Sequence, residues 1–181
     1  MLNIPNSISF GRLLLIPVFI WLALTNNLAL ACVTIFVASF TDWLDGYAAR
    51  KLNQFTRLGQ LLDPISDRLY ILALLFVIYN LELAPIIILV FILLREFILT
   101  GLMIYLKTRG ITGLPVHYLG KMGAFCLLIG LPGLIFAEAF VETAYIWLTI
   151  GWSFLIWGLF LYAFSAYKYF EHAKVVLSKY V

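Results

Sequence analysis

Six apolar stretches of membrane-spanning length follow one another along this 181-residue chain. A helix needs about 20 apolar residues to cross the hydrocarbon core of a bilayer. The stretches cover residues 8–25, 28–49, 60–80, 85–107, 120–138 and 144–168, with short connections between them. Hydrophobic residues make up 64% of the chain and charged residues 12%, and a soluble domain of this size cannot bury so much apolar surface. We therefore expect an all-α integral membrane protein with six transmembrane helices, not a soluble helical bundle.

Lys and Arg residues are unevenly distributed between the two sets of connections. With six spans both termini lie on one side, and the three opposite connections fall around Asn26, Glu82 and residues 138–143. These connections contain no Lys or Arg, and all 12 such residues lie on the other side or within reach of it. Cytoplasmic loops carry the excess of positive charge, so we predict a multi-pass protein of the cell membrane with both termini cytoplasmic. No internal repeat is visible, which predicts a single membrane-embedded domain over residues 1–181.

The acidic residues concentrate near the predicted cytoplasmic surface. All four aspartates, Asp42, Asp45, Asp63 and Asp67, lie within 26 residues. On a helix, residues three or four positions apart share a face. Asp42 and Asp45 therefore share a face at the end of the second stretch, and Gly59, Asp63 and Asp67 share one at the start of the third. Two neighbouring antiparallel helices would bring the four carboxylates together.

Four carboxylates held together repel one another, and burying them near hydrocarbon is costly. Protonation of some of them, or bound divalent cations, could relieve the repulsion. Oxygen ligands select hard ions such as Mg²⁺, Mn²⁺ or Ca²⁺, and the segment contains no His or Cys. We favour one or two hard metal ions over the alternative that the aspartates are solvated flanking charges.

Small residues and one proline shape the same two predicted helices. Gly46, Ala49 and Gly59 allow close approach of the helices or leave room for a bulky ligand, and both interpretations stay open. Pro64 suits either the first position of a helix or an early turn. We expect the third helix to begin earlier, near Thr56, because the Gly59 face is otherwise broken.

The acidic segment resembles the signature of the CDP-alcohol phosphatidyltransferase family, with all eight positions filled. The signature runs here as Asp42-x2-Asp45-Gly46-x2-Ala49-Arg50-x8-Gly59-x3-Asp63-x3-Asp67. The preceding stretch "NIPNSISFGRLLLIPVF" and the later "LLREFILTG" are similar to the bacterial phosphatidylglycerophosphate synthase branch. The resemblance extends over most of the chain.

This resemblance implies a reaction, a metal and a set of site residues. Members of the family have six transmembrane helices, are usually homodimers, use Mg²⁺ or Mn²⁺, and displace CMP from a CDP-linked lipid such as CDP-diacylglycerol with an acceptor hydroxyl. The resemblance implies a pair of metal ions, with Asp67 also acting as the catalytic general base. The implied metal ligands are Asp42, Asp45, Asp63 and Asp67. The implied nucleotide-binding residues are Asp42, Gly46, Ala49, Arg50 and Gly59.

Three basic residues are predicted to hold a phosphate of the acceptor: Arg95, Arg109 and Lys121. Arg95 lies in a strongly apolar stretch, where an arginine is costly unless it is paired or faces a cavity. Its alternative role is a structural pair with Glu96 or with an aspartate. Arg109 and Lys121 flank a predicted cytoplasmic loop, and membrane anchoring is the alternative for both. Arg12 ranks lower as a phosphate ligand.

Two glycerol-type acceptors stay open. The stretch "REFILTG" is similar to phosphatidylglycerophosphate synthases, which use glycerol 3-phosphate, although Met103 stands where that branch usually has Arg. The stretch "GLPVHYLGK" is similar to actinobacterial cardiolipin synthases, which use phosphatidylglycerol. We predict glycerol 3-phosphate by a narrow margin, because Arg95 and Lys121 are available for a small anionic acceptor.

A small cation transporter is the alternative from a different class. Transport predicts ionisable residues near the bilayer midplane in several helices. In this chain the aspartates cluster at one predicted face of the membrane, which favours the enzyme. No feature of the sequence indicates a nucleic-acid partner.

Overall fold

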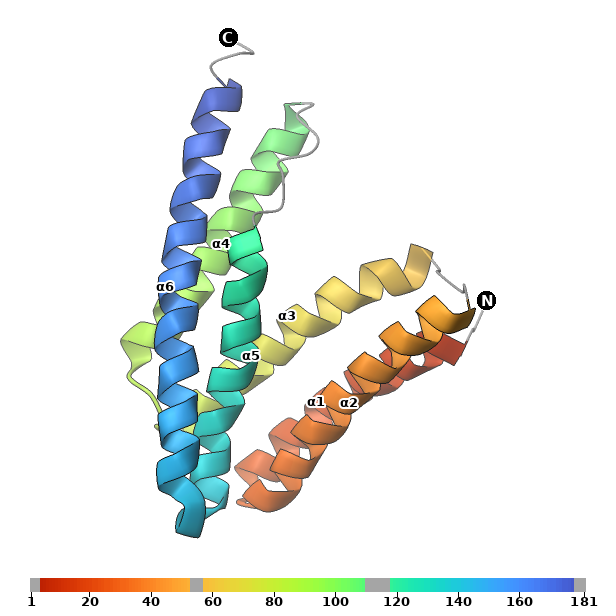
Figure 1. Ribbon diagram of the computed structural model, residues 1–181, viewed down its shortest axis with the longest axis vertical. Helices are drawn as coiled ribbons and strands as arrows, with labels where there is room; N and C mark the ends of the chain where they lie inside the picture. Colours follow the sequence, from red (N-terminus) through yellow and green to blue (C-terminus); the bar gives the residue numbers. More distant parts are fainter. Residues whose placement is uncertain (1–3, 53–56, 110–117, 178–181) are drawn as a thin grey trace. The chain divides into compact units, whose positions relative to one another are not determined.

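A computed structural model of the chain describes the backbone of residues 4–52, 57–109 and 118–177, and the side chains of 11–41, 65–109 and 118–176 (Figure 1). Within these ranges the protein is all-helical, which confirms the all-α part of the predicted fold class. The helices are α1 (Ile4–Leu24), α2 (Leu28–Leu52), α3 (Arg57–Asn80), α4 (Ile86–Thr108), α5 (Tyr118–Ala139) and α6 (Ala144–Leu177). A short 3-10 turn, η1 (Val141–Thr143), joins α5 to α6.

Most helix ends lie within a few residues of the ends that hydropathy predicts. Helix α3 begins at Arg57 and contains Pro64, as the spacing of its acidic face requires. Helix α1 begins at Ile4, earlier than expected. The largest difference concerns α6, which continues to Leu177 instead of ending near Lys168.

The extension of α6 follows from packing. Lys168 ends the apolar stretch, but one buried face of the helix continues beyond it. This face contains Tyr162, then Tyr169 two turns later and Ala173 one further turn along. Charged residues therefore mark the end of the membrane-compatible segment, whereas the helix continues as long as this face is packed. Lys168 and Glu171 form an exposed ion pair of 2.8 Å on the opposite side of the same turns.

Three segments of the described chain are long and apolar enough to span a bilayer: Ile86–Thr108, Tyr118–Ala139 and Val141–Val176. Two shorter apolar segments, Gly11–Leu24 and Leu28–Thr41, belong to α1 and α2. At 1.5 Å per residue, such short segments reach only about two thirds of the hydrocarbon thickness. Both helices are longer than these segments, because α1 begins at Ile4 and α2 continues to Leu52.

Two helices end in the same way without glycine. Asn26 and Glu82 both have left-handed backbones, with φ of 60° and 55°. After Asn26, the amide of Asn27 donates to the carbonyl of Leu22, and after Glu82 the amide of Leu83 donates to the carbonyl of Ile78. This is the Schellman arrangement, which satisfies the last carbonyls of α1 and α3 and reverses the chain sharply.

Glu82→Gly is expected to stabilise the protein. A left-handed backbone costs a non-glycine residue about 1 kcal/mol, which corresponds to about 2–4 °C in the unfolding temperature of a chain of this size. The measurement is the apparent unfolding temperature in detergent. Glu82→Ala is the control, because alanine keeps the strain while removing the charge. An equal rise in both variants would assign the effect to the carboxylate.

The chain divides into two compact units, of which the first comprises Met1–Leu83 and Leu134–Leu148. In this unit α1 packs against both α2 and α3. Ala31, Ile35 and Ala38 form one buried face of α2, and Phe19 of α1 stands 6.3 Å from Tyr70 of α3, ring centroid to centroid. Helix α1 is therefore the element that touches both helices of the acidic segment.

The second unit comprises Ala84–Gly133 and Thr149–Val181. Its helices α5 and α6 run side by side (Figure 1) and meet through glycines. A Cβ on Gly130 would lie 2.7 Å from the backbone nitrogen of Leu155, and a Cβ on Gly123 would lie 2.5 Å from the ring of Tyr162. Association of helices in lipid depends on such close packing, because lipid tails are as apolar as the side chains they replace.

Candidate active site

The eight signature positions lie in the last turns of one helix and the first turns of the next. On α2 they are Asp42, Asp45, Gly46, Ala49 and Arg50, and on α3 they are Gly59, Asp63 and Asp67. Both helices are continuous through these positions, so the spacings place the aspartates of each helix on one face. Of these side chains the structure describes that of Asp67, and those within residues 42–64 lie outside its described part. The meeting of all four carboxylates therefore stays a prediction.

Asp67 lies beside an arginine of α1. The Nη1 atom of Arg12 is 3.8 Å from Oδ1 of Asp67. The Arg12 side chain is 5% exposed and that of Asp67 56% exposed. This ion pair joins α1 to α3 at the last aspartate of the signature. Sequence analysis ranked Arg12 low as a site residue, since nothing in the primary structure links it to Asp67.

Two buried hydroxyl groups lie on α3 next to this pair. Ser66 and Tyr70 are buried, and among the described residues neither hydroxyl has a hydrogen-bond partner. They are four residues apart, so they share the face of α3 that continues into Ala73 and Val77. Sequence analysis did not identify them. The sequence signal that could have identified them is the four-residue spacing from Ser66 to Tyr70, with Ser66 directly before Asp67.

Arg95 of α4 makes three contacts within the second unit. Its Nη1 donates to Oε1 of Glu96 over 2.6 Å, and its Nη2 donates to Oγ of Ser165 on α6 over 2.8 Å. Its guanidinium carbon lies 3.9 Å from the centre of the Tyr162 ring. Its Nε is buried without a hydrogen-bond partner among the described residues. The arginine thus ties α4 to α6, and the pair with Glu96 is the contact that its alternative role predicts.

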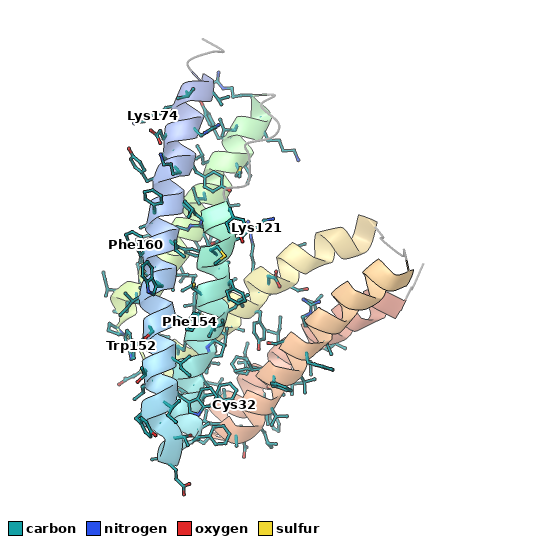
Figure 2. All side chains as sticks on the ribbon, viewed as in Figure 1. Cys32, Lys121, Trp152, Phe154, Phe160 and Lys174 are labelled. Atoms are coloured by element: carbon teal, nitrogen blue, oxygen red, sulfur yellow. The ribbon has the colours of Figure 1, made fainter. Side chains whose placement is uncertain are left out.

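Arg109 and Lys121 also belong to the second unit and are exposed. Arg109 follows the last residue of α4, with its guanidinium carbon 5.5 Å from the centre of the Tyr105 ring. Lys121 lies in the first turn of α5, where Figure 2 labels it. Both side chains are accessible to a ligand, and their part in acceptor binding stays a prediction.

The donor chemistry of the acidic segment fits a hard divalent cation. Its ligand atoms are carboxylate oxygens, which Mg²⁺ and Mn²⁺ accept and which zinc or iron sites rarely use alone. Asp67 is more than half exposed despite its contact with Arg12, so its carboxylate is accessible. Among the side chains that the structure describes, no group of three or more His, Cys, Asp or Glu residues could hold a metal ion.

Comparison with known proteins agrees with the helices and the signature. The chain matches the CDP-alcohol phosphatidyltransferase family over residues 2–160. It is 37% identical over 169 residues to a Mycobacterium tuberculosis protein whose name assigns it provisionally as a cardiolipin synthase, covering 93% of this chain and 81% of that protein. A Streptomyces coelicolor cardiolipin synthase (CMP-forming) is 34% identical over 174 residues, with the same coverage of 93% and 81%.

Relatives named for a different acceptor are almost as similar. The CDP-diacylglycerol–glycerol-3-phosphate 3-phosphatidyltransferase of Rickettsia typhi is 34% identical over 178 residues, covering 96% of this chain and 98% of that protein. The chain belongs to the CDP-alcohol phosphatidyltransferase family. It is therefore a membrane enzyme of a family that transfers a phosphatidyl group from a CDP-linked lipid to an alcohol with the help of a divalent metal.

Proposed function

We propose that this protein is a cardiolipin synthase of the CMP-forming type, which joins CDP-diacylglycerol to phosphatidylglycerol. The observation that carries the proposal is the 37% identity to the mycobacterial relative, with the Streptomyces cardiolipin synthase second. The guanidinium of Arg95 bonds to Glu96 and Ser165, which fits its alternative role as a structural residue. The comparisons thus favour the acceptor that the sequence motifs ranked second.

In the proposed reaction, the acceptor hydroxyl attacks the phosphorus that carries the diacylglycerol. A new oxygen–phosphorus bond forms as the bond to the CMP oxygen breaks. Asp67 accepts the proton of the attacking hydroxyl, for which its exposed carboxylate is available. Asp42, Asp45, Asp63 and Asp67 would hold the divalent metal, which when bound neutralises charge on the pyrophosphate and the leaving CMP.

The remaining signature residues bind the nucleotide in this proposal. Gly46, Ala49 and Gly59 leave space along α2 and α3 for the cytidine. Arg50 contacts the phosphates of the nucleotide, and Asp42 also takes part in nucleotide binding. Arg109 and Lys121 hold the acceptor phosphate, whereas Arg95 serves to tie α4 to α6. The enzyme works as a homodimer with six transmembrane helices in one domain. Its termini and its site face the cytoplasm, where the basic residues lie.

Phosphatidylglycerophosphate synthase is the second candidate. The Rickettsia relative matches nearly end to end, covering 96% of this chain and 98% of its own, and it is named for glycerol 3-phosphate. The stretch that begins at Arg95 and ends at Gly101 also resembles that branch. The two candidates differ in the acceptor and share the CDP-diacylglycerol chemistry.

An acceptor assay tests the proposal. Purified protein receives CDP-diacylglycerol, Mg²⁺ or Mn²⁺, and either phosphatidylglycerol or glycerol 3-phosphate, and both CMP and the lipid product are measured. We expect cardiolipin from phosphatidylglycerol. Product from glycerol 3-phosphate alone would establish the second candidate, and CMP release with neither acceptor would direct attention to other alcohols. No CMP under any condition would reopen the transporter hypothesis.

Metal removal is expected to stop the reaction. Four carboxylates without a cation cannot neutralise a pyrophosphate, so a chelator should reduce CMP release to background. Addition of Mg²⁺ or Mn²⁺ in excess of the chelator should restore it. CMP release that continues at full rate in the chelator would contradict the metal site.

A further inference from the structure

Arg12 is the one buried charged side chain in the part of the chain whose side chains are described. It lies on α1, in a unit whose other fully buried side chains are almost all apolar. A guanidinium in such surroundings is expensive unless an opposite charge lies close to it. Asp67 supplies that charge from α3, at 3.8 Å. Arg12 lies outside the signature, so the energetic cost of burying its guanidinium requires an explanation.

The geometry of the pair is that of an orienting contact. A charge-assisted hydrogen bond between nitrogen and oxygen is about 2.7–2.9 Å long. The 3.8 Å separation from Nη1 to Oδ1 is longer, so the attraction acts without a short hydrogen bond to that oxygen. The Asp67 side chain is still 56% exposed. Arg12 can therefore direct the carboxylate while much of that side chain remains exposed.

The position of Arg12 is itself well determined by packing. Helix α1 packs against both α2 and α3, the two helices that carry the signature. The Arg12 side chain is 5% exposed, so its guanidinium has little freedom to move away from α3. A buried cation beside an exposed carboxylate therefore limits the orientations that the carboxylate can take.

We infer that Arg12 is a positioning residue for Asp67: its buried guanidinium holds the carboxylate in the orientation that receives the proton of the acceptor hydroxyl. This inference rests on the proposed function, because it assumes that Asp67 is the general base. Arg12 acts through Asp67 and contacts neither substrate. Its loss therefore affects turnover more than substrate affinity.

The first test compares Arg12→Gln with Arg12→Lys in the CMP-release assay. We expect Arg12→Gln to lower kcat by about 10–100-fold, because small misplacements of a catalytic group have effects of that size. The KM values for CDP-diacylglycerol and for the acceptor should stay within about twofold of those of the unmodified enzyme, since Arg12 contacts neither. Arg12→Lys keeps the charge and should recover part of kcat. Lys174→Gln, at an exposed position near the end of α6 (Figure 2), is the control and should behave as the unmodified enzyme.

Two kinetic results would overturn the inference. An Arg12→Gln enzyme with unchanged kcat would show that Asp67 needs no such support. A raised KM with unchanged kcat would make Arg12 a substrate ligand instead. If the unmodified enzyme released no CMP with any acceptor, the proposed function would fail on its own, and the pair would still be open to the second test.

The second test needs no substrate. The apparent unfolding temperature is measured for Arg12→Gln, Asp67→Asn and the double variant in detergent. Replacing Asp67 removes the negative charge that lies 3.8 Å from the buried guanidinium, so Asp67→Asn should lower this temperature by several degrees more in the presence of Arg12 than in its absence. Strictly additive changes would contradict the pair and, with it, the inference.

Discussion

Asp67→Asn is expected to reduce CMP release by about 1,000-fold or more, while CDP-diacylglycerol still binds. A general base contributes about 10²–10⁴-fold to a rate, and an amide can neither accept the proton nor carry the negative charge of a metal ligand. Asparagine has nearly the same shape as aspartate, so the proposed nucleotide site should keep its shape. The defect should therefore appear in kcat much more than in donor affinity.

The measurement is single-turnover CMP release together with equilibrium binding of CDP-diacylglycerol, on protein that is monodisperse in detergent. The second condition matters because Asp67 is the counter-charge of the buried Arg12, and its loss also lowers stability. Glu171→Gln is the matched control, since Glu171 is an exposed carboxylate in an ion pair with Lys168. It should leave both quantities unchanged. Near-normal turnover in Asp67→Asn would remove Asp67 from the role of base.

Hydropathy predicts most of this fold because of a physical constraint that the bilayer imposes. Backbone groups in lipid must be satisfied within the chain, and a helix achieves this locally, so long apolar stretches become helices. The six observed helices follow the six predicted stretches. Hydropathy gives the wrong helix end where a helix continues beyond its apolar stretch. Helix α6 is such a case, because the buried residues Tyr169 and Ala173 continue it past the charged Lys168.

The helix ends were less predictable for a related reason. Glycine is the usual residue after the last turn of a helix, and here Asn26 and Glu82 take its place with left-handed backbones. Asparagine is a recognised substitute, whereas glutamate is not. The left-handed backbone at Glu82 therefore runs against the local preference of the residue.

The candidate site also contains features that the sequence predicts and contacts that it does not predict. Regular spacing places Asp63 and Asp67 on one face of α3, because the periodicity of a helix is known in advance. The contact between Arg12 and Asp67 depends on how α1 packs against α3, which no local pattern encodes. Arg95 illustrates both cases. Its bond to Glu96 is between neighbours and was anticipated, whereas Ser165 reaches it from another helix, 70 residues away.

Gly130→Ala is expected to destabilise the protein by about 1–3 kcal/mol, although alanine is the better helix former by about 1 kcal/mol. The added Cβ would lie 2.7 Å from the backbone nitrogen of Leu155 and 3.0 Å from the carbonyl oxygen of Gly151. Backbone atoms cannot rotate aside as a side chain can, so α5 and α6 must separate. Helices in lipid lose their packing energy when they separate, with no gain from solvent to offset it. Gly130→Leu should prevent folding of this pair altogether.

The matched control is Gly101→Ala on α4. A Cβ at Gly101 meets nothing within 4 Å, so only the helix propensity changes and stability should stay constant or rise. A third variant, Gly120→Ala, adds a methyl group 3.6 Å from Nη2 of Arg95, which is ordinary van der Waals contact, and it should be tolerated. The measurement is the apparent unfolding temperature and the monodisperse fraction in detergent. If Gly130→Ala and Gly101→Ala responded alike, the contact between α5 and α6 could not be as close as these distances require.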